Sequence, residues 1–215
     1  MTALVRIEYY RKSIIRKIRK IEKYSASQIL YLLACSIITS IRYSPARLIR
    51  FPFDVRNRKM IRWGIGFTTG KNCRLEALEY SSKVPTLLIG NNVQINDNVH
   101  IAALRQVRIG DNVLIASKVF ISDCSHGEYG QVDGSSPYMP PAMRGLVSED
   151  VLIEDNVWLG DNVVVLPGAT IGYGSIIGSS AVVTGNIPPM TIAVGIPAKV
   201  IKFYNEVAKK WEKKL

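Results

Sequence analysis

The dominant hydrophobic pattern in this chain is an aliphatic residue at every sixth position. Between residues 153 and 183 these positions hold Ile153, Leu159, Val165, Ile171, Ile177 and Val183. The same period runs upstream through Ile89, Ile95 and Ile101 and, after a slip of two residues, through Ile109, Ile115 and Ile121. Side chains recur every 3.6 residues in a helix and every two in a strand. A period of six therefore indicates a structural repeat.

We interpret each hexad as a short extended segment and a tight turn, so that three hexads make one triangular coil with the aliphatic position inside. The turn needs residues that tolerate left-handed backbone angles, and the fourth place of the hexad supplies Asn92, Asn98, Asn112, Asn156, Asn162 and Gly168. Twelve hexads predict four coils, to which the flanks 67–78 and 189–197 would add one or two. A β-sandwich is the alternative, but its strands would alternate with period two.

Two further hydrophobic patterns precede the repeat and predict an N-terminal helical segment over residues 1–62. Residues 6–23 place apolar side chains three or four apart among many basic ones, which is typical of a basic amphipathic helix. Residues 29–41 are an apolar run that is shorter than the roughly 20 residues needed to span a bilayer. We expect a loop at residues 43–52, the repeat domain over residues 63–202, and a short C-terminal helix over residues 203–215.

Charge separates the N-terminal segment from the repeat. Residues 1–62 hold 15 Lys or Arg and 3 Asp or Glu, whereas residues 63–215 hold 13 and 14. This asymmetry indicates an anionic partner or surface. The segment could cap the open end of the coil, lie on an anionic membrane surface through residues 1–50, or do both. Nucleic acid is disfavoured because no recognition motif accompanies the charge.

Histidine and cysteine are scarce, which narrows the chemistry. The three cysteines are unpatterned, so we expect a reducing, cytoplasmic compartment and no disulfide framework. His100 ends a hexad and is interpreted as a turn residue. His126 stands where the repeat breaks and an excursion over residues 127–150 leaves the coil. A histidine at the root of such a loop suits proton transfer, although residue type alone leaves a surface turn open.

At this point the chain resembles a known family, the hexapeptide-repeat acyltransferases, over residues 64–202. The most specific stretch is residues 153–202, "IEDNVWLGDNVVVLPGATIGYGSIIGSSAVVTGNIPPMTIAVGIPAKVIK". It is similar to the galactoside, maltose and bacterial polysaccharide O-acetyltransferases. The resemblance implies a mainly β fold, a left-handed parallel β-helix. It also implies that His126 is the general base, which takes the proton of an acceptor hydroxyl as that oxygen attacks acetyl-CoA.

The same resemblance implies the cofactor and substrate positions. Those for the cofactor are Trp158, Asp161, Ser179, Thr184, Gly185, Lys199 and Lys202. Asp161 replaces a small residue and Gly185 a frequent Lys, which weakens the expected contact at both. The two lysines would face the CoA phosphates, or else belong to a solvated basic tail. Asn96 would contact the acceptor, although Asn96 or Asn98 could equally form a corner. Asp123 could orient His126, contact the acceptor, or lie in a surface turn.

The resemblance also implies a homotrimer, in which the histidine of one subunit faces the cofactor site of the next. We expect an acetyl-CoA-dependent O-acetyltransferase that acts on a saccharide in surface polysaccharide biosynthesis. The saccharide could be lipid-linked. Open alternatives are a sugar-nucleotide N-acetyltransferase, an acyl-cysteine mechanism at Cys124, and a non-catalytic scaffold. A trimeric carbonic anhydrase is disfavoured because two histidines cannot supply three zinc ligands per site, and no metal is expected.

Overall fold

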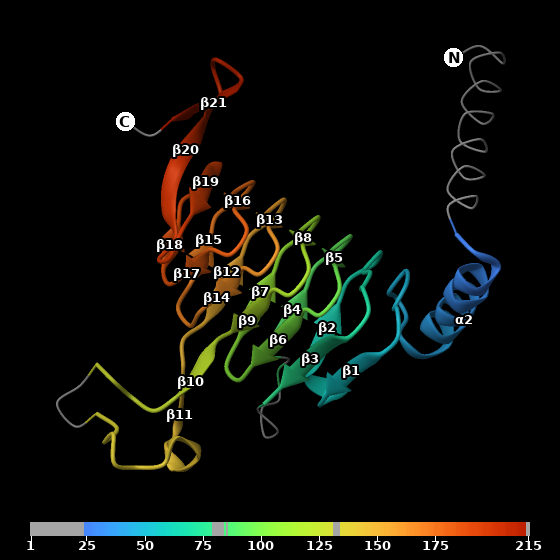
Figure 1. Ribbon diagram of the computed structural model, residues 1–215, viewed down its shortest axis with the longest axis horizontal. Helices are drawn as coiled ribbons and strands as arrows, with labels where there is room; N and C mark the ends of the chain where they lie inside the picture. The colour runs from blue at the N-terminus through green and yellow to red at the C-terminus, as the bar shows by residue number, and fades with distance from the viewer. Residues whose placement is uncertain (1–23, 79–83, 85, 131–133, 214–215) are drawn as a thin grey trace.

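The computed structural model describes residues 24–78, 84, 86–130 and 134–213. The helix predicted at residues 6–23 lies outside the described residues. The described chain winds into a stack of triangular coils with an α-helix at one end, which confirms the parallel β-helix predicted from the repeat (Figure 1).

Each coil visits three flat faces in turn, and strands of successive coils pair in parallel on each face. Face 1 holds β1 (Phe53–Arg56), β3 (Cys73–Ala77), β6 (His100–Ala103), β9 (Phe120–Ser122), β14 (Val164–Val165) and β17 (Val182–Val183). Face 2 holds β2 (Ile61–Trp63), β4 (Leu87–Ile89), β7 (Val107–Ile109), β12 (Val151–Ile153), β15 (Thr170–Ile171) and β18 (Asn186–Ile187). Face 3 holds β5 (Gln94–Ile95), β8 (Leu114–Ile115), β13 (Trp158–Leu159), β16 (Ile176–Ile177), β19 (Thr191–Val194), β20 (Lys199–Asn205) and β21 (Lys210–Lys213).

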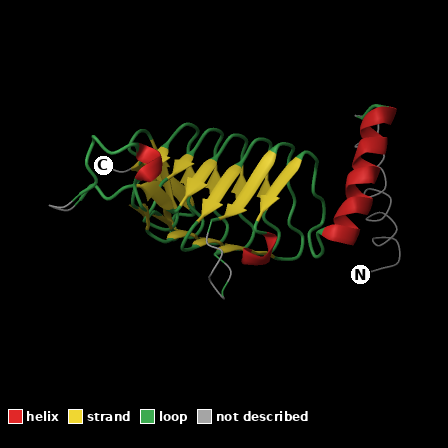
Figure 2. Ribbon diagram, turned by 90° about the horizontal axis from the view of Figure 1, so that it is seen from below, coloured by secondary structure: helices red, strands yellow, loops and turns green. Residues whose placement is uncertain are grey.

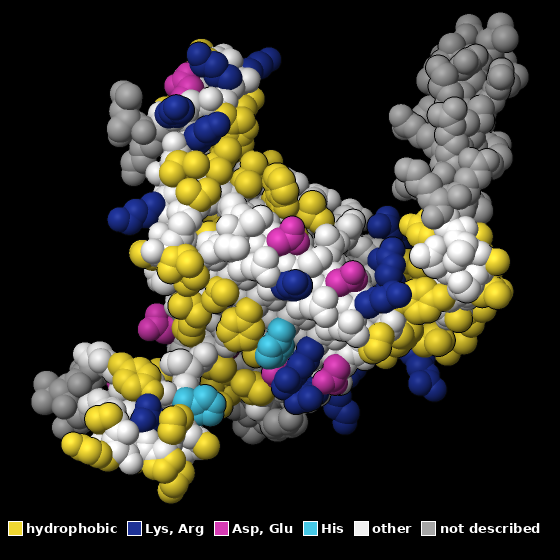
Figure 3. Space-filling model, viewed as in Figure 1, with side chains coloured by type: hydrophobic (Ala, Val, Ile, Leu, Met, Phe, Trp, Pro, Cys, Tyr) yellow, Lys and Arg dark blue, Asp and Glu magenta, His cyan; other side chains and the backbone are white. Residues whose placement is uncertain are grey.

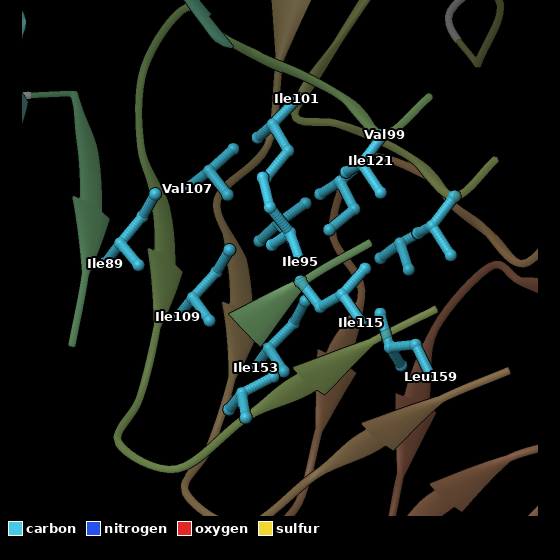
Figure 4. Packing of buried hydrophobic residues seen from close by; sticks show 14 of the residues in the cluster. Ile89, Ile95, Val99, Ile101, Val107, Ile109, Ile115, Ile121, Ile153 and Leu159 are labelled. Carbon is cyan, nitrogen blue, oxygen red and sulfur yellow. The ribbon is translucent and has the colours of Figure 1, made fainter. Parts of the chain in front are cut away.

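The aliphatic position of each hexad points into the stack and is buried. Ile95, Ile115 and Leu159, which follow one another on face 3, are at most 1% exposed. Figure 4 shows these side chains meeting those of faces 1 and 2 along the axis of the coil. Truncation of one such side chain to Ala typically costs about 2–5 kcal/mol. The period of six is therefore the spacing of a continuous apolar core.

The corners carry the predicted left-handed residues. The five asparagines at the fourth place of the hexad have φ between 55° and 59°, and Gly168 has φ 77°. The third place adds a regularity that the sequence analysis missed, because an aspartate there accepts a backbone N–H from the coil below. The pairs are Asp97 with Lys71, Asp111 with Asn91, Asp155 with Asp111, and Asp161 with Ser117. Each turn is thus tied to the next.

Helix α2 (Ala26–Arg42) forms where the apolar run at residues 29–41 predicted it, and it stands across the N-terminal end of the stack (Figure 2). Cys35 and Thr39 are buried against the first coil. The Thr39 hydroxyl accepts the backbone N–H of Ile49 at 2.8 Å. The first coil begins before the predicted boundary at residue 63, since β1 and β2 already pair with β3 and β4. None of the described helices is long and apolar enough to cross a membrane.

The predicted C-terminal helix at residues 203–215 is wrong. The chain turns back instead, and β20 pairs antiparallel with β19 while β21 pairs with β20. The last strand of face 3 would otherwise present unpaired N–H and C=O groups at the end of the stack. The hairpin satisfies these groups, and Tyr204 packs edge-on against Trp211 across it. Edge pairing therefore overrides the local helical pattern.

Asp123 is a buried anchor and does not lie in a surface turn. Its side chain is fully buried and accepts the backbone N–H groups of Leu104, Arg105 and Gln106 at 2.7–2.8 Å. Its own carbonyl accepts the N–H of Glu149 at 2.9 Å. Burial raises the pKa of Asp123 above its ordinary value, although the three N–H groups oppose the rise. The carboxylate is thus occupied in fixing the base of the excursion to the coil below.

We predict that Asp123→Ala lowers the free energy of unfolding by about 3 kcal/mol or more, because it leaves three buried N–H groups without acceptors. Asp150→Ala is the control: its carboxylate is 48% exposed and pairs with Arg105 on the surface, so its loss should cost less than about 1 kcal/mol. Urea unfolding of both variants measures the difference. Equal midpoints would contradict the anchoring role.

His100 is also misplaced by the sequence analysis, since it lies in strand β6 and not in a turn. Its Nε2 is 2.7 Å from Oε1 of Glu76, whose other oxygen accepts Arg74. The ring lies 5.2 Å from that of Phe120. Burial is the largest single influence on the pKa of Glu76 and would raise it. The hydrogen bonds and charges of Arg74 and His100 together outweigh burial, so this pKa lies below its ordinary value of 4.5.

The lowered pKa of Glu76 predicts how acid affects stability. A depressed carboxyl pKa stabilises the fold above the unfolded-state value, and that stabilisation is lost as pH falls through the folded-state pKa. From about pH 4.5 downward the wild type should therefore lose stability more steeply than Glu76→Gln, which has no proton to gain. Urea unfolding at a series of acidic pH values provides the test, and parallel curves for the two proteins would refute the prediction.

Candidate active site

The excursion leaves the coil at the corner between faces 1 and 2 as a two-stranded ribbon. Strand β10 (Cys124–His126) continues from β9, and β11 (Leu146–Ser148) pairs with it antiparallel. Figure 1 shows the ribbon projecting away from the stack. The stack continues without a gap after the excursion, because β12 pairs directly with β7. The loop is therefore held on a rigid base, and His126 ends its first strand.

The side chain of His126 is exposed, and its imidazole has no hydrogen-bond partner among the described residues. Its backbone carbonyl accepts the hydroxyl of Tyr129, which itself accepts Arg144 at 2.7 Å. Arg144 also donates to the carbonyl of Met139 at 2.8 Å. Gly127 follows with φ 98°, where an added Cβ would lie 2.8 Å from the Tyr129 oxygen. The local contacts fix the backbone of His126 and leave its ring nitrogens open to solvent.

Cys124, the alternative nucleophile, lies in a setting that favours the neutral thiol. Its side chain is half-buried beside Ser122, and burial raises the pKa of the thiol above its ordinary value. Reactive cysteines need a lowered pKa because the thiolate is the nucleophile. The environment of Cys124 thus disfavours the acyl-cysteine mechanism.

Three of the predicted cofactor residues form a column along face 3 and its corner with face 1. Trp158 lies on β13, is 47% exposed, and stands between β8 and β16. Asp161 and Ser179 occupy successive turns of the corner, where an added Cβ on Gly160 would lie 2.7 Å from the Ser179 nitrogen. The Asp161 carboxylate is already bound by the N–H of Ser117 at 2.8 Å. Asp161 is therefore one of the aspartates that tie each turn to the coil below, and its side chain is used in that contact.

The two predicted lysines extend the same face. Lys199 and Lys202 lie on β20, opposite Val194 and Ile192 of β19. They therefore lie at the C-terminal end of the face that carries Trp158, on a strand of the C-terminal hairpin.

Thr184 and Gly185 lie elsewhere in the cross-section. They form the turn between β17 and β18, at the corner of faces 1 and 2 from which the ribbon also leaves. An added Cβ on Gly185 would meet nothing within 4 Å, so packing does not require glycine there. In a triangle this corner is the one opposite face 3. One chain therefore holds His126, Thr184 and Gly185 on one side and the Trp158 column on the other.

Asn96 lines a cavity that the sequence analysis did not foresee. The cavity measures about 430 Å³ and lies between α2 and the corner of faces 3 and 1. Its polar lining includes Gln28, Tyr31, Arg50, Lys71, Gln94, Asn96 and Asp97. Burial raises the pKa of Tyr31 to about 12, and its hydroxyl donates to the carbonyl of Phe51 at 2.7 Å. Asn98 forms the turn, so Asn96 is not the corner residue.

Part of this cavity is built by α2, whose contacts with the coil join segments far apart in the sequence. Lys71 places its ammonium group 4.6 Å from the ring centre of Tyr31. No local pattern in residues 29–41 distinguishes Tyr31 from its aliphatic neighbours, so only the folded structure reveals this wall. No cluster of three or more His, Cys, Asp or Glu suited to a metal ion occurs in the part of the chain that the structure describes.

Comparison with solved structures supports the fold. A mutant of the N-acyltransferase AntD from Bacillus cereus, crystallised with dTDP-4-amino-4,6-dideoxyglucose and coenzyme A, superposes with a TM-score of 0.63 at 18% identity. The match covers 86% of this chain and 92% of that chain. A likeness at this identity concerns the fold alone, which is the predicted left-handed β-helix.

Comparison with known sequences establishes the family. Residues 150–185 match the family model described as bacterial transferase hexapeptide (six repeats). The putative lipopolysaccharide biosynthesis O-acetyl transferase WbbJ of Escherichia coli K12 is 45% identical over 193 residues, which cover 89% of this chain and 96% of that protein. The galactoside O-acetyltransferase of the same organism is 35% identical over 155 residues, 72% of each chain. The chain therefore belongs to the hexapeptide-repeat acetyltransferases, as the resemblance in its sequence implied.

Proposed function

We propose that the protein is an acetyl-CoA-dependent O-acetyltransferase that modifies a saccharide of a bacterial surface polysaccharide. The observation that carries the proposal is the exposed imidazole of His126 on a rigid ribbon root, within a chain of this family. Both Escherichia coli relatives are named as O-acetyltransferases, one of lipopolysaccharide biosynthesis and one of galactosides. Because acetyl-CoA is the donor, we place the reaction on the cytoplasmic side of the cell.

In the proposed reaction an imidazole nitrogen of His126 accepts the proton of the acceptor hydroxyl as the oxygen attacks the thioester carbonyl. A new C–O bond forms, the C–S bond breaks, and the CoA thiolate leaves and takes up the proton. The products are the acetyl ester and free CoA. General base catalysis of this kind needs an unprotonated imidazole nitrogen within reach of the acceptor hydroxyl. We assign Asp123 an anchoring role and not the orientation of the ring, because its buried carboxylate accepts three backbone N–H groups.

The cofactor would lie along the column of Trp158 and Ser179, with its pantetheine arm against the regularly spaced backbone groups of the corner turns. Lys199 and Lys202 lie on the C-terminal extension of the same face and would meet the CoA phosphates as point charges. Asp161 would contribute only its backbone, because its carboxylate caps the Ser117 turn.

We also propose a homotrimer with one site at each subunit boundary. The supporting observation is the position of His126, Thr184 and Gly185 at the corner opposite face 3. A cyclic assembly can bring that corner of one subunit against the column of the next. Thr184 and Gly185 would then border the cofactor from the subunit that supplies the base.

The acceptor would bind beside Asn96, in the cavity under α2. Aromatic and amide side chains such as Tyr31, Gln28 and Gln94 offer the apolar surfaces and hydrogen bonds that a sugar ring requires. An acceptor hydroxyl distinguishes this proposal from a sugar-nucleotide N-acetyltransferase, whose acceptor would be an amine on the sugar. Competition between hydroxyl and amino sugars for labelled acetyl-CoA separates the two.

We predict that His126→Ala lowers kcat by about 10²–10⁴-fold, since a positioned base contributes that much. The variant should still bind CoA, which a ligand-induced rise in melting temperature would show. His100→Gln is the matched control, because the second histidine pairs with Glu76 and should leave kcat within a few-fold. Cys124→Ser should also remain active. Release of the free CoA thiol measures all three, and normal turnover by His126→Ala would refute the assignment.

A further inference from the structure

The outward face of α2 is an apolar surface that none of the described residues covers. Leu30, Leu33, Ile37 and Ile41 recur at helical spacing and are 55–75% exposed. They lie opposite the buried side of the helix, which Cys35 and Thr39 mark. Four large aliphatic side chains in one stripe are more than the scattered exposure that is normal for a surface. We call Leu30, Leu33, Ile37 and Ile41 the α2 stripe.

Helix α2 carries no charged side chain before its last residue, Arg42. With 17 residues the helix is about 26 Å long. A helix that buries one side in protein and presents an uncharged apolar side outward is suited to lying along an interface.

Basic groups gather at the same end of the molecule as the stripe. Residues 24–62 hold seven Lys or Arg and one Asp or Glu. Arg42, Arg47, Lys59 and Arg62 are exposed. Figure 3 shows Lys and Arg side chains gathered beside the hydrophobic surface of α2. The apolar stripe and the basic groups therefore occupy the same end of the molecule.

We infer that the α2 stripe rests in the surface of an anionic lipid bilayer, with the basic groups of the first coil against the lipid headgroups. The stripe enters the boundary between headgroups and acyl chains, and each Lys or Arg near the surface adds attraction to anionic lipid. The inference goes beyond the proposed reaction and does not depend on it.

Charge argues against two other occupants of the stripe. A second copy docked stripe to stripe would bring two basic coils together, and the like charges would repel. Residues 6–23 of the same chain carry eight Lys or Arg and two Asp or Glu, so bringing them to the basic end of the stack meets the same repulsion. An anionic bilayer instead complements both the apolar stripe and the basic groups of the first coil.

This attachment has a consequence for the acceptor. The cavity that Asn96 lines lies on the inner side of α2, within the same end of the stack. A bilayer against the outer side would therefore bring lipid-linked saccharides close to that cavity, while the C-terminal hairpin at the other end of the stack points away from the membrane.

The test is cosedimentation of the full-length protein with vesicles of phosphatidylcholine, with and without phosphatidylglycerol. We expect binding to the anionic vesicles that weakens as salt is raised. The double variant Leu33→Ser/Ile37→Ser should bind about tenfold more weakly for each side chain removed. Val207→Ser, at a 96% exposed apolar residue in the C-terminal hairpin, is the matched control and should bind as wild type.

A second variant, Arg42→Gln/Arg47→Gln, should lose the preference for anionic vesicles and keeps the test decisive if the stripe variant folds poorly. All variants should retain acetyl transfer to a soluble acceptor, which separates this inference from the proposed reaction. The inference would be overturned if the wild-type protein did not bind anionic vesicles, or if the stripe variant bound them as tightly as the wild type. Light scattering that shows a smaller assembly for the stripe variant, without vesicle binding by wild type, would assign the stripe to a second copy.

Discussion

The whole arrangement depends on a constraint at the corners of the coil. A left-handed asparagine at the fourth place turns the chain, and an aspartate at the third place ties that turn to the coil below. Together they keep each side of the triangle six residues long. Every side chain then has a fixed face, and equivalent positions stack in register from one coil to the next. The apolar core and the surface columns are two consequences of this one spacing.

The fixed register also explains why the proposed base and the proposed cofactor column lie apart within one chain. The excursion begins at the corner between faces 1 and 2, whereas the column of Trp158 and Ser179 belongs to face 3 and its border with face 1. A rigid stack cannot bend one toward the other. In the proposed homotrimer, the two elements come from neighbouring subunits. Asp123 anchors the base of the ribbon that carries His126.

Much of the fold could be predicted from the sequence because the repeat is local and regular. The inward aliphatics and the corner asparagines can be recognised from spacing alone, and α2 from an apolar run. The failures share one cause, which is a partner distant in sequence. The C-terminal strands form because they pair with the open edge of β19. The position of His100 depends on its contact with Glu76. The burial of Asp123 depends on backbone N–H groups some 17–19 residues away. Spacing within a hexad carries no trace of such contacts, nor of the cavity under α2.

The most direct test of the account is subunit complementation. His126→Ala and Trp158→Asp, each expected to be inactive alone, are unfolded together in equal amounts and refolded as mixed assemblies. If each site takes its histidine from one subunit and its cofactor column from the next, random mixing of two variants in a cyclic trimer should restore about a quarter of the wild-type activity. Mixtures that stay as inactive as the separate variants would show that both elements must come from a single chain, contrary to the account.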